Sequence, residues 1–297
     1  MLENLINFNY QYNNDASVNI DKRFFIEFKP ISRTLNTWKN ELLITSESIA
    51  NSTNKPIMIC LSGGIDSEVL ARSFLEKSID FVAIIIRHTF GTNEHDIQYA
   101  IDFCNQNSVK YKIVELDFER FLKVNIGDYI KQGYRGTNIF HYFQIYVLEM
   151  IEMLGGCAIM AAGEQLYYTI NGIICQAWSP SFLMALQWCK NNNSQHYPFF
   201  FYQNSELFAS YMEDDLLKVL LNNPRYYTTH MSRGISLEKQ LIYHSHWENM
   251  IRRPKLNGFE KMWPDRTKKH EELKNLFPDI KLKYFPVDTI KKQLHIK

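Results

Sequence analysis

The sequence predicts an α/β protein in which helices cover both faces of a parallel sheet. From residue 55 to residue 162, short apolar runs alternate with stretches of helical period, which is the pattern of right-handed strand–helix–strand crossovers. The 297 residues are 45% hydrophobic and 22% charged, with 33 basic and 32 acidic residues. This composition excludes disordered, collagen-like and coiled-coil chains.

Four of the apolar runs predict strands, and three intervening stretches predict helices. The first of them, 57–61, is short and continuously apolar, as expected of a parallel strand buried on both faces. The expected strands are 57–61, Phe81–Ile86, Tyr111–Leu116 and Cys157–Ala162. The expected helices are Ser67–Lys77, 97–104 and His141–Leu154. The first has Asp66 or Ser67 near its N-cap, and the second has apolar residues at i, i+3, i+4 and i+7. The third ends at Gly155 and Gly156.

The flanking regions carry weaker patterns. We expect a small hairpin from Phe24–Phe28 with residues 18–20, and helices over Leu35–Ala50 and Ser205–Leu221. Six prolines divide the rest of the C-terminal part into short pieces. We therefore expect three parts: an N-terminal extension (1–54), the α/β domain (55–180) and a mostly helical substrate or lid region (181–297).

The strongest functional signal is the turn Ser62-Gly63-Gly64-Ile65-Asp66-Ser67, between the first strand and its helix. Two adjacent glycines permit unusual backbone angles and a close approach, so that successive N–H groups can converge on an anion. The helix N-terminus and the hydroxyls of Ser62 and Ser67 add further donors. Such a turn suits phosphate or pyrophosphate, and ligands of parallel sheets bind at this edge.

Asp66 is unexpected beside phosphates, because a carboxylate would repel them. A divalent cation between the two would remove the repulsion, so the sequence predicts Mg²⁺, although an N-cap role for Asp66 is compatible with it. Neither G-x-x-x-x-G-K-[ST] nor G-x-G-x-x-G occurs, which leaves no Walker-type or dinucleotide-binding fingerprint.

The motif resembles the S-G-G-x-D-S signature of the PP-loop ATP pyrophosphatases, over about Lys55 to Tyr168. This resemblance implies a HUP-like α/β fold, ATP and Mg²⁺ as cofactors, and cleavage of ATP between the α and β phosphates with transfer of AMP to an acceptor oxygen. It also implies that the end of Phe81–Ile86 contacts adenine, which places Ile86 and His88 beside the base.

Within that family, the chain is most similar to the synthetase half of asparagine synthetase-like enzymes. Gly163-Glu164 resembles their Gly-Glu turn, and Arg253-Pro254-Lys255 their late basic motif on pyrophosphate, where positive charge would offset the charge of the leaving group. No cysteine follows Met1, and Gln165 to Tyr168 lack the acidic pair of many relatives. Glutaminase activity in the same chain is therefore not expected, and the acceptor stays open.

The expected site follows from the motif and the resemblance together. Its catalytic residues are Asp66, Glu164, Arg253 and Lys255, with Asp66 and Glu164 as metal ligands. Its nucleotide-binding residues are Leu61, Ser62, Gly63, Gly64, Ile65, Asp66, Ser67, Ile86, His88 and Gly163.

The C-terminal part suggests alternatives to a small-molecule ligase. Residues 251–297 hold thirteen Lys and Arg against six acidic residues, which could attract nucleic acid. The main prediction is therefore an AMP-forming ligase that acts on a small-molecule acceptor. The two alternatives are a PP-loop enzyme that modifies tRNA or another nucleic acid, and a non-catalytic ATP sensor.

The location and redox state of the chain are predicted from what its sequence lacks. Neither a signal segment nor an apolar run of the roughly 20 residues that span a membrane is visible. The five cysteines include no C-x-x-C pair. We expect a cytoplasmic protein with reduced thiols and no membrane association.

Overall fold

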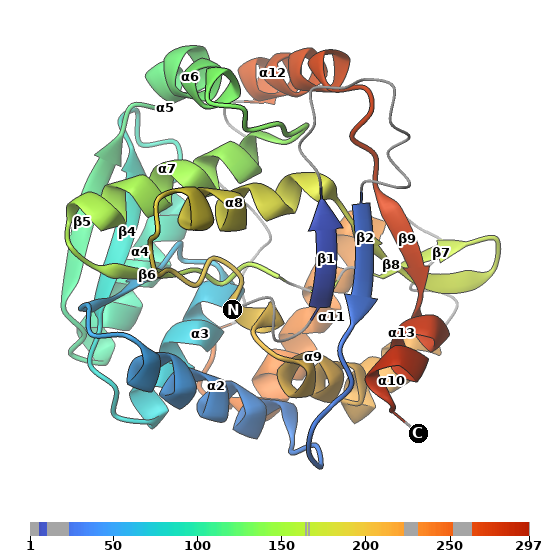
Figure 1. The fold of residues 1–297 in the computed structure, drawn as a ribbon. Helices are drawn as coiled ribbons and strands as arrows, with labels where there is room; N and C mark the ends of the chain where they lie inside the picture. Colours follow the sequence, from blue (N-terminus) through green and yellow to red (C-terminus); the bar gives the residue numbers. More distant parts are fainter. Residues whose placement is uncertain are drawn as a thin grey trace.

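The fold is built on a four-stranded parallel sheet of order β5-β4-β3-β6, on the left in Figure 1. The computed structural model describes residues 6–10, 24–163, 165, 167–222, 231–251 and 263–296. The strands are β3 (Ile57–Cys60), β4 (Val82–His88), β5 (Tyr111–Leu116) and β6 (Cys157–Ile159). The register places Ile59 opposite Ala83 and Ile159.

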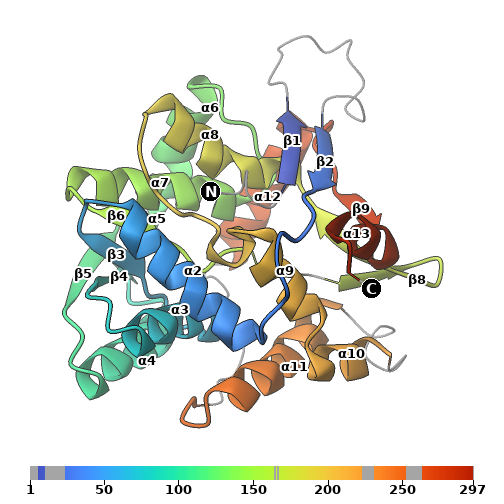
Figure 2. The same ribbon diagram turned by 60° about the horizontal axis from the view of Figure 1, so that its bottom comes forward.

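Helices cover both faces of this sheet, as the sequence predicts. They are α3 (Ile65–Glu76), α4 (Glu94–Gln106) and α7 (Ile139–Met153). Figure 1 shows α7 on the opposite side of the sheet from α3, and Figure 2 shows α4 beside α3. The arrangement follows from the strand order, because the chain returns across the sheet between β5 and β6 and must cross the other face. The predicted fold class, a parallel sheet flanked by helices, is confirmed.

Three details of the core differ from the sequence-based expectation. The fourth strand ends at Ile159 rather than Ala162. Helix α3 begins at Ile65 rather than Ser67, and its N-cap is Gly64, so Asp66 and Ser67 lie near the cap but do not form it. A glycine in an extended conformation can take the N-cap position without a capping side chain, which moves Asp66 into the first turn of the helix.

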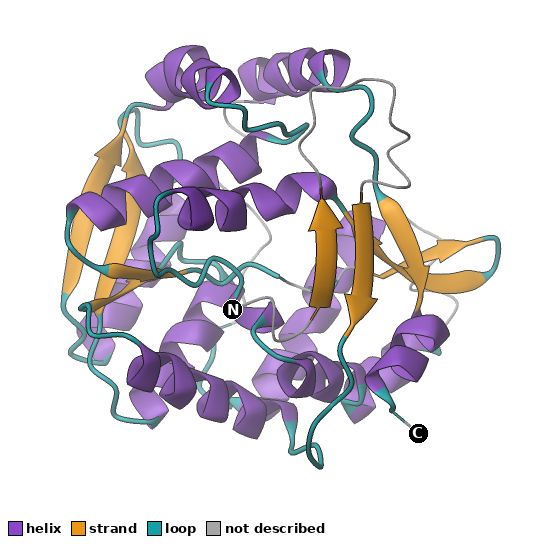
Figure 3. Ribbon diagram, in the orientation of Figure 1, coloured by secondary structure: helices purple, strands orange, loops and turns teal. Residues whose placement is uncertain are grey.

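Two smaller antiparallel sheets lie beside the core (Figure 3). Strand β2 (Phe24–Phe28) pairs with β1 (Ile6–Tyr10). The predicted hairpin therefore has a different first strand, and residues 18–20 lie outside the described residues. Strands β7 (Tyr167–Ile170), β8 (Ile173–Trp178) and β9 (Lys283–Pro286) form the other sheet. Pairing of β9 with β8 connects the predicted C-terminal region to the α/β domain, and the division into three parts remains a prediction.

The remaining described segments are mostly helical. The predicted helix Ser205–Leu221 is broken in two, because the Asp214 side chain accepts hydrogen bonds from the backbone N–H groups of Leu216 and Leu217 and starts a new helix. These segments are α2 (Trp38–Ser52), α5 (Phe118–Arg120), a π-helical turn (Phe121–Asn125), α6 (Ile126–Lys131), 3₁₀ turns (Pro180–Leu183 and Phe200–Tyr202), α8 (Met184–Asn191), α9 (Ser205–Met212), α10 (Asp215–Leu221), α11 (Met231–His246), α12 (Trp263–Leu276) and α13 (Val287–Leu294).

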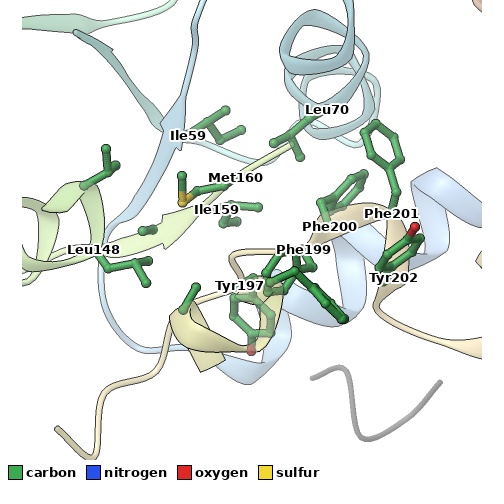
Figure 4. Close-up of a cluster of buried hydrophobic side chains, with 14 of the residues drawn as sticks. Ile59, Leu70, Leu148, Ile159, Met160, Tyr197, Phe199, Phe200, Phe201 and Tyr202 are labelled. Atoms are coloured by element: carbon green, nitrogen blue, oxygen red, sulfur yellow. The ribbon is translucent and has the colours of Figure 1, made fainter. Parts of the chain in front are cut away.

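An aromatic segment, residues 197–202, closes the free edge of the sheet beside β6. The Tyr197 N–H donates to the Ala158 carbonyl at 2.8 Å, and the Met160 N–H donates to the Tyr197 carbonyl at 3.0 Å. Figure 4 shows the aromatic side chains of this segment beside Ile159 and Leu70. All of these aromatic side chains are buried, so the segment is part of the core.

The cysteines and the lengths of the helices bear on disulfides and membrane spans. All five cysteines are free thiols. Within the described ranges, no helix combines the length and the apolar character that crossing a membrane requires.

Candidate nucleotide site

A cavity of about 360 Å³ opens at the carboxyl edge of the central sheet. The predicted turn after β3 lines one side of it, and the ends of β4 and β6 line the floor. Helix α7 supplies the facing wall. Its volume lies within the range of roughly 300–1,000 Å³ that is usual for small-molecule sites.

The hydroxyls of the turn are tied to its own backbone. Ser67 Oγ accepts from the Ser62 N–H at 3.2 Å and donates to the Gly64 carbonyl at 2.8 Å. Ser62 Oγ accepts from the Gly64 N–H at 3.2 Å and lies 3.1 Å from Ser67 Oγ. These bonds fix the shape of the turn, and they engage two of the N–H groups that the sequence assigned to an anion.

The two glycines of the turn have different roles. Gly63 has a φ of +82°, and a Cβ there would lie 1.8 Å from the Asp96 carbonyl oxygen in α4. Gly64 has an ordinary φ of −73°, and a Cβ would meet only Ser62 Oγ, at 3.2 Å. Only Gly63 therefore requires glycine, because it combines a left-handed backbone with close contact to a helix.

Asp66 has partners that the sequence did not predict. Its carboxylate accepts from Lys239 Nζ and from Tyr243 Oη, each at 2.7 Å. Both partners belong to α11, and the Lys239 side chain is only 7% exposed, against 25% for Asp66. The protein itself thus supplies a positive charge beside the carboxylate, where the sequence predicted Mg²⁺.

Oxygen ligands for Mg²⁺ are nevertheless present on the cavity surface. The side chains of Asp66 and Asp96 both line the cavity, and carboxylates are the ligands that Mg²⁺ prefers in proteins. Within the described ranges, no group of three or more His, Cys, Asp or Glu residues has the geometry of a metal site. The donor set fits an ion that also takes ligands from phosphate and water, as Mg²⁺ usually does.

His88 lies at the end of β4 as predicted, and its ring is neutral. Burial lowers the pKa of His88 to about 4. Nδ1 lies 2.7 Å from Thr92 Oγ1, and the ring stacks on Phe118 with the centroids 5.1 Å apart. A buried ring held on two sides can shape the cavity but is a poor general base at neutral pH.

The floor of the cavity also holds a thiol. Cys60 ends β3, and burial raises the pKa of its thiol to about 12. At neutral pH it is protonated and therefore a weak nucleophile.

The wall from α7 is apolar apart from one amide. Phe140, Phe143 and Val147 face the cavity together with Gln144, since residues three and four apart share one side of a helix. Gln144 Oε1 is buried and has no hydrogen-bond partner. An unpaired buried acceptor is costly unless a ligand or water satisfies it.

The structure brings together part of the predicted site. Leu61, Ser62, Gly64, Asp66, Ser67, Ile86 and His88 line the cavity. Gly63 and Ile65 belong to the same turn without lining it, and Gly163, with a φ of +93°, packs against the Tyr202 ring instead. Glu164, Arg253 and Lys255 lie outside the described residues, so their roles remain predictions.

Sequence reasoning missed Lys239, Tyr243, Gln144 and Asp96. Lys239 is 173 residues from Asp66, and no local pattern marks a lysine on a helix as the partner of a distant turn. The signal for Gln144 was available: it is a polar residue on the apolar side of the predicted helix 141–154, a position that usually requires a partner.

Two solved structures have limited similarity to this chain. One is NMN synthetase from Francisella tularensis, at 14% identity and a TM-score of 0.36, over 84% of this chain and 97% of that one. The other is the NH3-dependent NAD synthetase from Campylobacter jejuni, in complex with the nitrate ion, at 15% identity and a TM-score of 0.35, over 74% of this chain and 100% of that one. No protein-family model and no curated protein matches the chain. Overlap this low does not bear on what the chain binds.

Proposed function

We propose that this protein is an ATP-dependent, AMP-forming ligase of the PP-loop type. It would adenylate a carboxylate, carbonyl or amide oxygen of a small molecule and release pyrophosphate, after which an amine or ammonia would displace AMP. The observation that carries the proposal is the Ser62–Ser67 turn, complete to the last residue of its motif, on the wall of a cavity at the carboxyl edge of a parallel sheet.

The two ends of the cavity differ as the two ends of a nucleotide do. Hydroxyls, the turn and the N-terminus of α3 lie at one end, where negative phosphate oxygens would be favoured. Phe140, Phe143 and Ile86 line the rest and would enclose a planar base. A nucleotide with its base against α7 would satisfy both ends.

Gln144 supports adenine as the base. Its buried Oε1 needs a donor, and the exocyclic amine of adenine is one, whereas the corresponding carbonyl of guanine is an acceptor. We infer that Gln144 selects a 6-amino purine, together with backbone groups at the end of β4.

Catalysis in this site would depend on position and charge. Mg²⁺ held by Asp66, with Asp96 or Glu164 as a second carboxylate, would neutralise phosphate charge. Arg253 or Lys255 would stabilise the leaving pyrophosphate. Neither the neutral His88 ring nor the protonated Cys60 thiol is suited to form a covalent intermediate. The chain's own contribution is therefore to hold the α phosphate open to an acceptor oxygen.

The test is the bond that is cleaved. Protein is incubated with ATP labelled separately at the α and γ phosphates, Mg²⁺ and a panel of carboxylates with an ammonium salt. We expect AMP and pyrophosphate as products. An ATP analogue with a methylene group between the β and γ phosphates should be cleaved, and an analogue with a methylene group between the α and β phosphates should not.

Two outcomes would contradict the proposal. Release of only ADP and orthophosphate would place cleavage at the wrong bond. Tight ATP binding without turnover on any acceptor would favour the ATP sensor. Nothing in the part of the chain that the structure describes favours the other alternative, a nucleic acid partner.

A further inference from the structure

A second cavity, of about 460 Å³, lies between the first turn of α7 and α12. It shares no lining residue with the nucleotide cavity. Phe140 and Gln144 of α7 face the nucleotide cavity, and Asn138 and His141 face the second one. The two cavities are therefore neighbours, separated by the width of one helix, roughly 10 Å.

The polar side of this cavity combines an amide, imidazole rings and two hydroxyls. Asn138 Oδ1 accepts from the Phe140 N–H at 3.0 Å, which identifies that atom as the oxygen. His270 Nε2, 3.0 Å from the same oxygen, must therefore carry a proton. The hydroxyls of Thr137 and Ser179 also line the cavity, and hydroxyls can donate or accept.

One polar atom at this cavity has no partner. His141 lines the cavity, and its Nδ1 is buried without a hydrogen bond. It lies in the first turn of α7, a helix of fifteen residues whose N-terminus carries partial positive charge. A ligand atom is the simplest partner for such a nitrogen.

Two positively charged side chains act on this cavity. Lys274 lines it, and no described residue forms an ion pair with that lysine. Burial, followed by the charges of Arg266 and Lys274, lowers the pKa of His270 to about 4. Burial and the neighbouring His270 lower the pKa of His141 to about 4. The nearby carboxylate of Asp279 is paired with Arg135 at 3.1 Å.

This charge distribution decides which ligand fits. Two neutral imidazoles could bind a metal cation, but Arg266 and Lys274 would repel it. An anion is attracted by the same charges and can draw a proton onto His270. Several donors around one space suit the three oxygens of a phosphate ester better than the two of a carboxylate.

The opposite wall of the cavity is apolar. Phe277, Pro278, Ile280 and Leu282 form it, and the Phe277 and Ile280 side chains are buried. The cavity is far larger than one phosphate group needs, so the ligand would have an apolar or aromatic body beside its anionic group.

We propose that the cavity between α7 and α12 binds a phosphate ester of a small molecule with an apolar or aromatic body. The phosphate lies against Lys274, His270 and His141, and the body lies against Phe277 and Ile280. This site is independent of the proposed reaction. It assigns a ligand-binding role to Lys274 and His270 of the basic C-terminal segment, which do not line the nucleotide cavity.

Phenyl phosphate is the probe, and titration calorimetry is the measurement. We expect Lys274→Gln to weaken its binding about tenfold or more, since the variant loses a charge-assisted hydrogen bond. The matched control is Lys268→Gln, which removes the same charge from an exposed position on α12 outside the cavity. It should stay within about twofold of the wild type.

A second variant protects the test against misfolding. His270→Gln keeps a donor toward Asn138 but cannot become charged, so it should fold and bind phenyl phosphate more weakly. In nuclear magnetic resonance at pH 6, the His270 ring of the wild type should shift toward the protonated form when phenyl phosphate is added.

Several results would overturn the proposal. The first is that the wild type does not bind phenyl phosphate. The second is that Lys274→Gln and Lys268→Gln lose affinity equally, and the third is that benzoate binds as tightly as phenyl phosphate. Weakened binding in Ser62→Ala with none in Lys274→Gln would place the probe in the nucleotide cavity instead. None of these results depends on whether ATP is cleaved.

Discussion

Replacing Gly63 by alanine tests the geometry of the turn most directly. The added Cβ would stand 1.8 Å from the Asp96 carbonyl oxygen and 2.5 Å from its carbon. Both are backbone atoms of α4, so relief requires moving the helix or the turn. The φ of +82° is also unfavourable for alanine.

The expected cost of Gly63→Ala combines two effects. A left-handed backbone costs an L-residue about 1–2 kcal/mol, and overpacking against rigid neighbours typically costs about 1–3 kcal/mol. Together they predict a loss of about 2–5 kcal/mol in the free energy of unfolding, a large part of the roughly 5–15 kcal/mol of a typical domain.

Gly64→Ala is the matched control, one residue further along. Its backbone angle suits alanine, and its Cβ would meet only the Ser62 hydroxyl oxygen at 3.2 Å. The loss of an N-cap glycine and the reduced freedom of the unfolded chain nearly cancel, so the change should stay within about 1 kcal/mol.

Urea unfolding followed by circular dichroism measures both variants under the same conditions. The reasoning fails if Gly63→Ala and Gly64→Ala have free energies of unfolding within about 1 kcal/mol of each other, because the contact with α4 would then not constrain the turn. ATP binding should follow the same order, with Gly63→Ala the weaker binder.

Three further predictions concern the cavity. Lys239→Met removes one of the two partners of Asp66 described above and should lower the free energy of unfolding by about 1–3 kcal/mol, less than for a fully buried pair. In urea unfolding, added Mg²⁺ should restore more stability to this variant than to the wild type. Equal effects of Mg²⁺ on both would argue against Asp66 as a metal ligand. Gln144→Leu should reduce the preference for ATP over GTP about tenfold in calorimetry, and an unchanged ratio would exclude Gln144 as the selector. The pKa of His88 lies near 4 in the folded chain and near 6.5 in the unfolded chain, so the unfolded chain binds the extra proton and the free energy of unfolding falls as the pH drops from about 6.5 to 4. In His88→Phe, the slope of this free energy against pH should be smaller by about 1.4 kcal/mol per pH unit in that window. An unchanged slope would contradict the neutral buried ring.

The central sheet could be predicted because its signals are local. A buried parallel strand must be apolar along its length, and the helices between strands must place apolar residues on one side. The runs at β3 and β4 satisfy these requirements within a few residues, whereas β5, at the edge of the sheet, carries Lys112 and Glu115 and is buried only at Leu116. The ends were less certain, because the cap at Gly64 has no side-chain hydrogen bond and the cap at Asp214 depends on two.

The pairing of β1 with β2 could not be predicted in the same way. Its partner strands are separated by 13 residues, too many for a tight turn to fix the register, and a strand with weak alternation accepts several registers. Strand β9 joins β8 from more than a hundred residues away, a distance over which a pattern in the sequence does not identify the partner.

By itself, the sequence determined the parallel sheet and the position of the glycine-containing turn after its first strand, because strand burial and glycine freedom act within a few residues. Only the tertiary structure decided that Lys239 lies beside Asp66, that Gln144 lines the cavity and has a buried, unpaired oxygen, and that His141 and His270 share a second cavity. These contacts join α7, α11 and α12 to other parts of the chain. They arise from the packing of whole helices, which residue spacing along the chain does not specify.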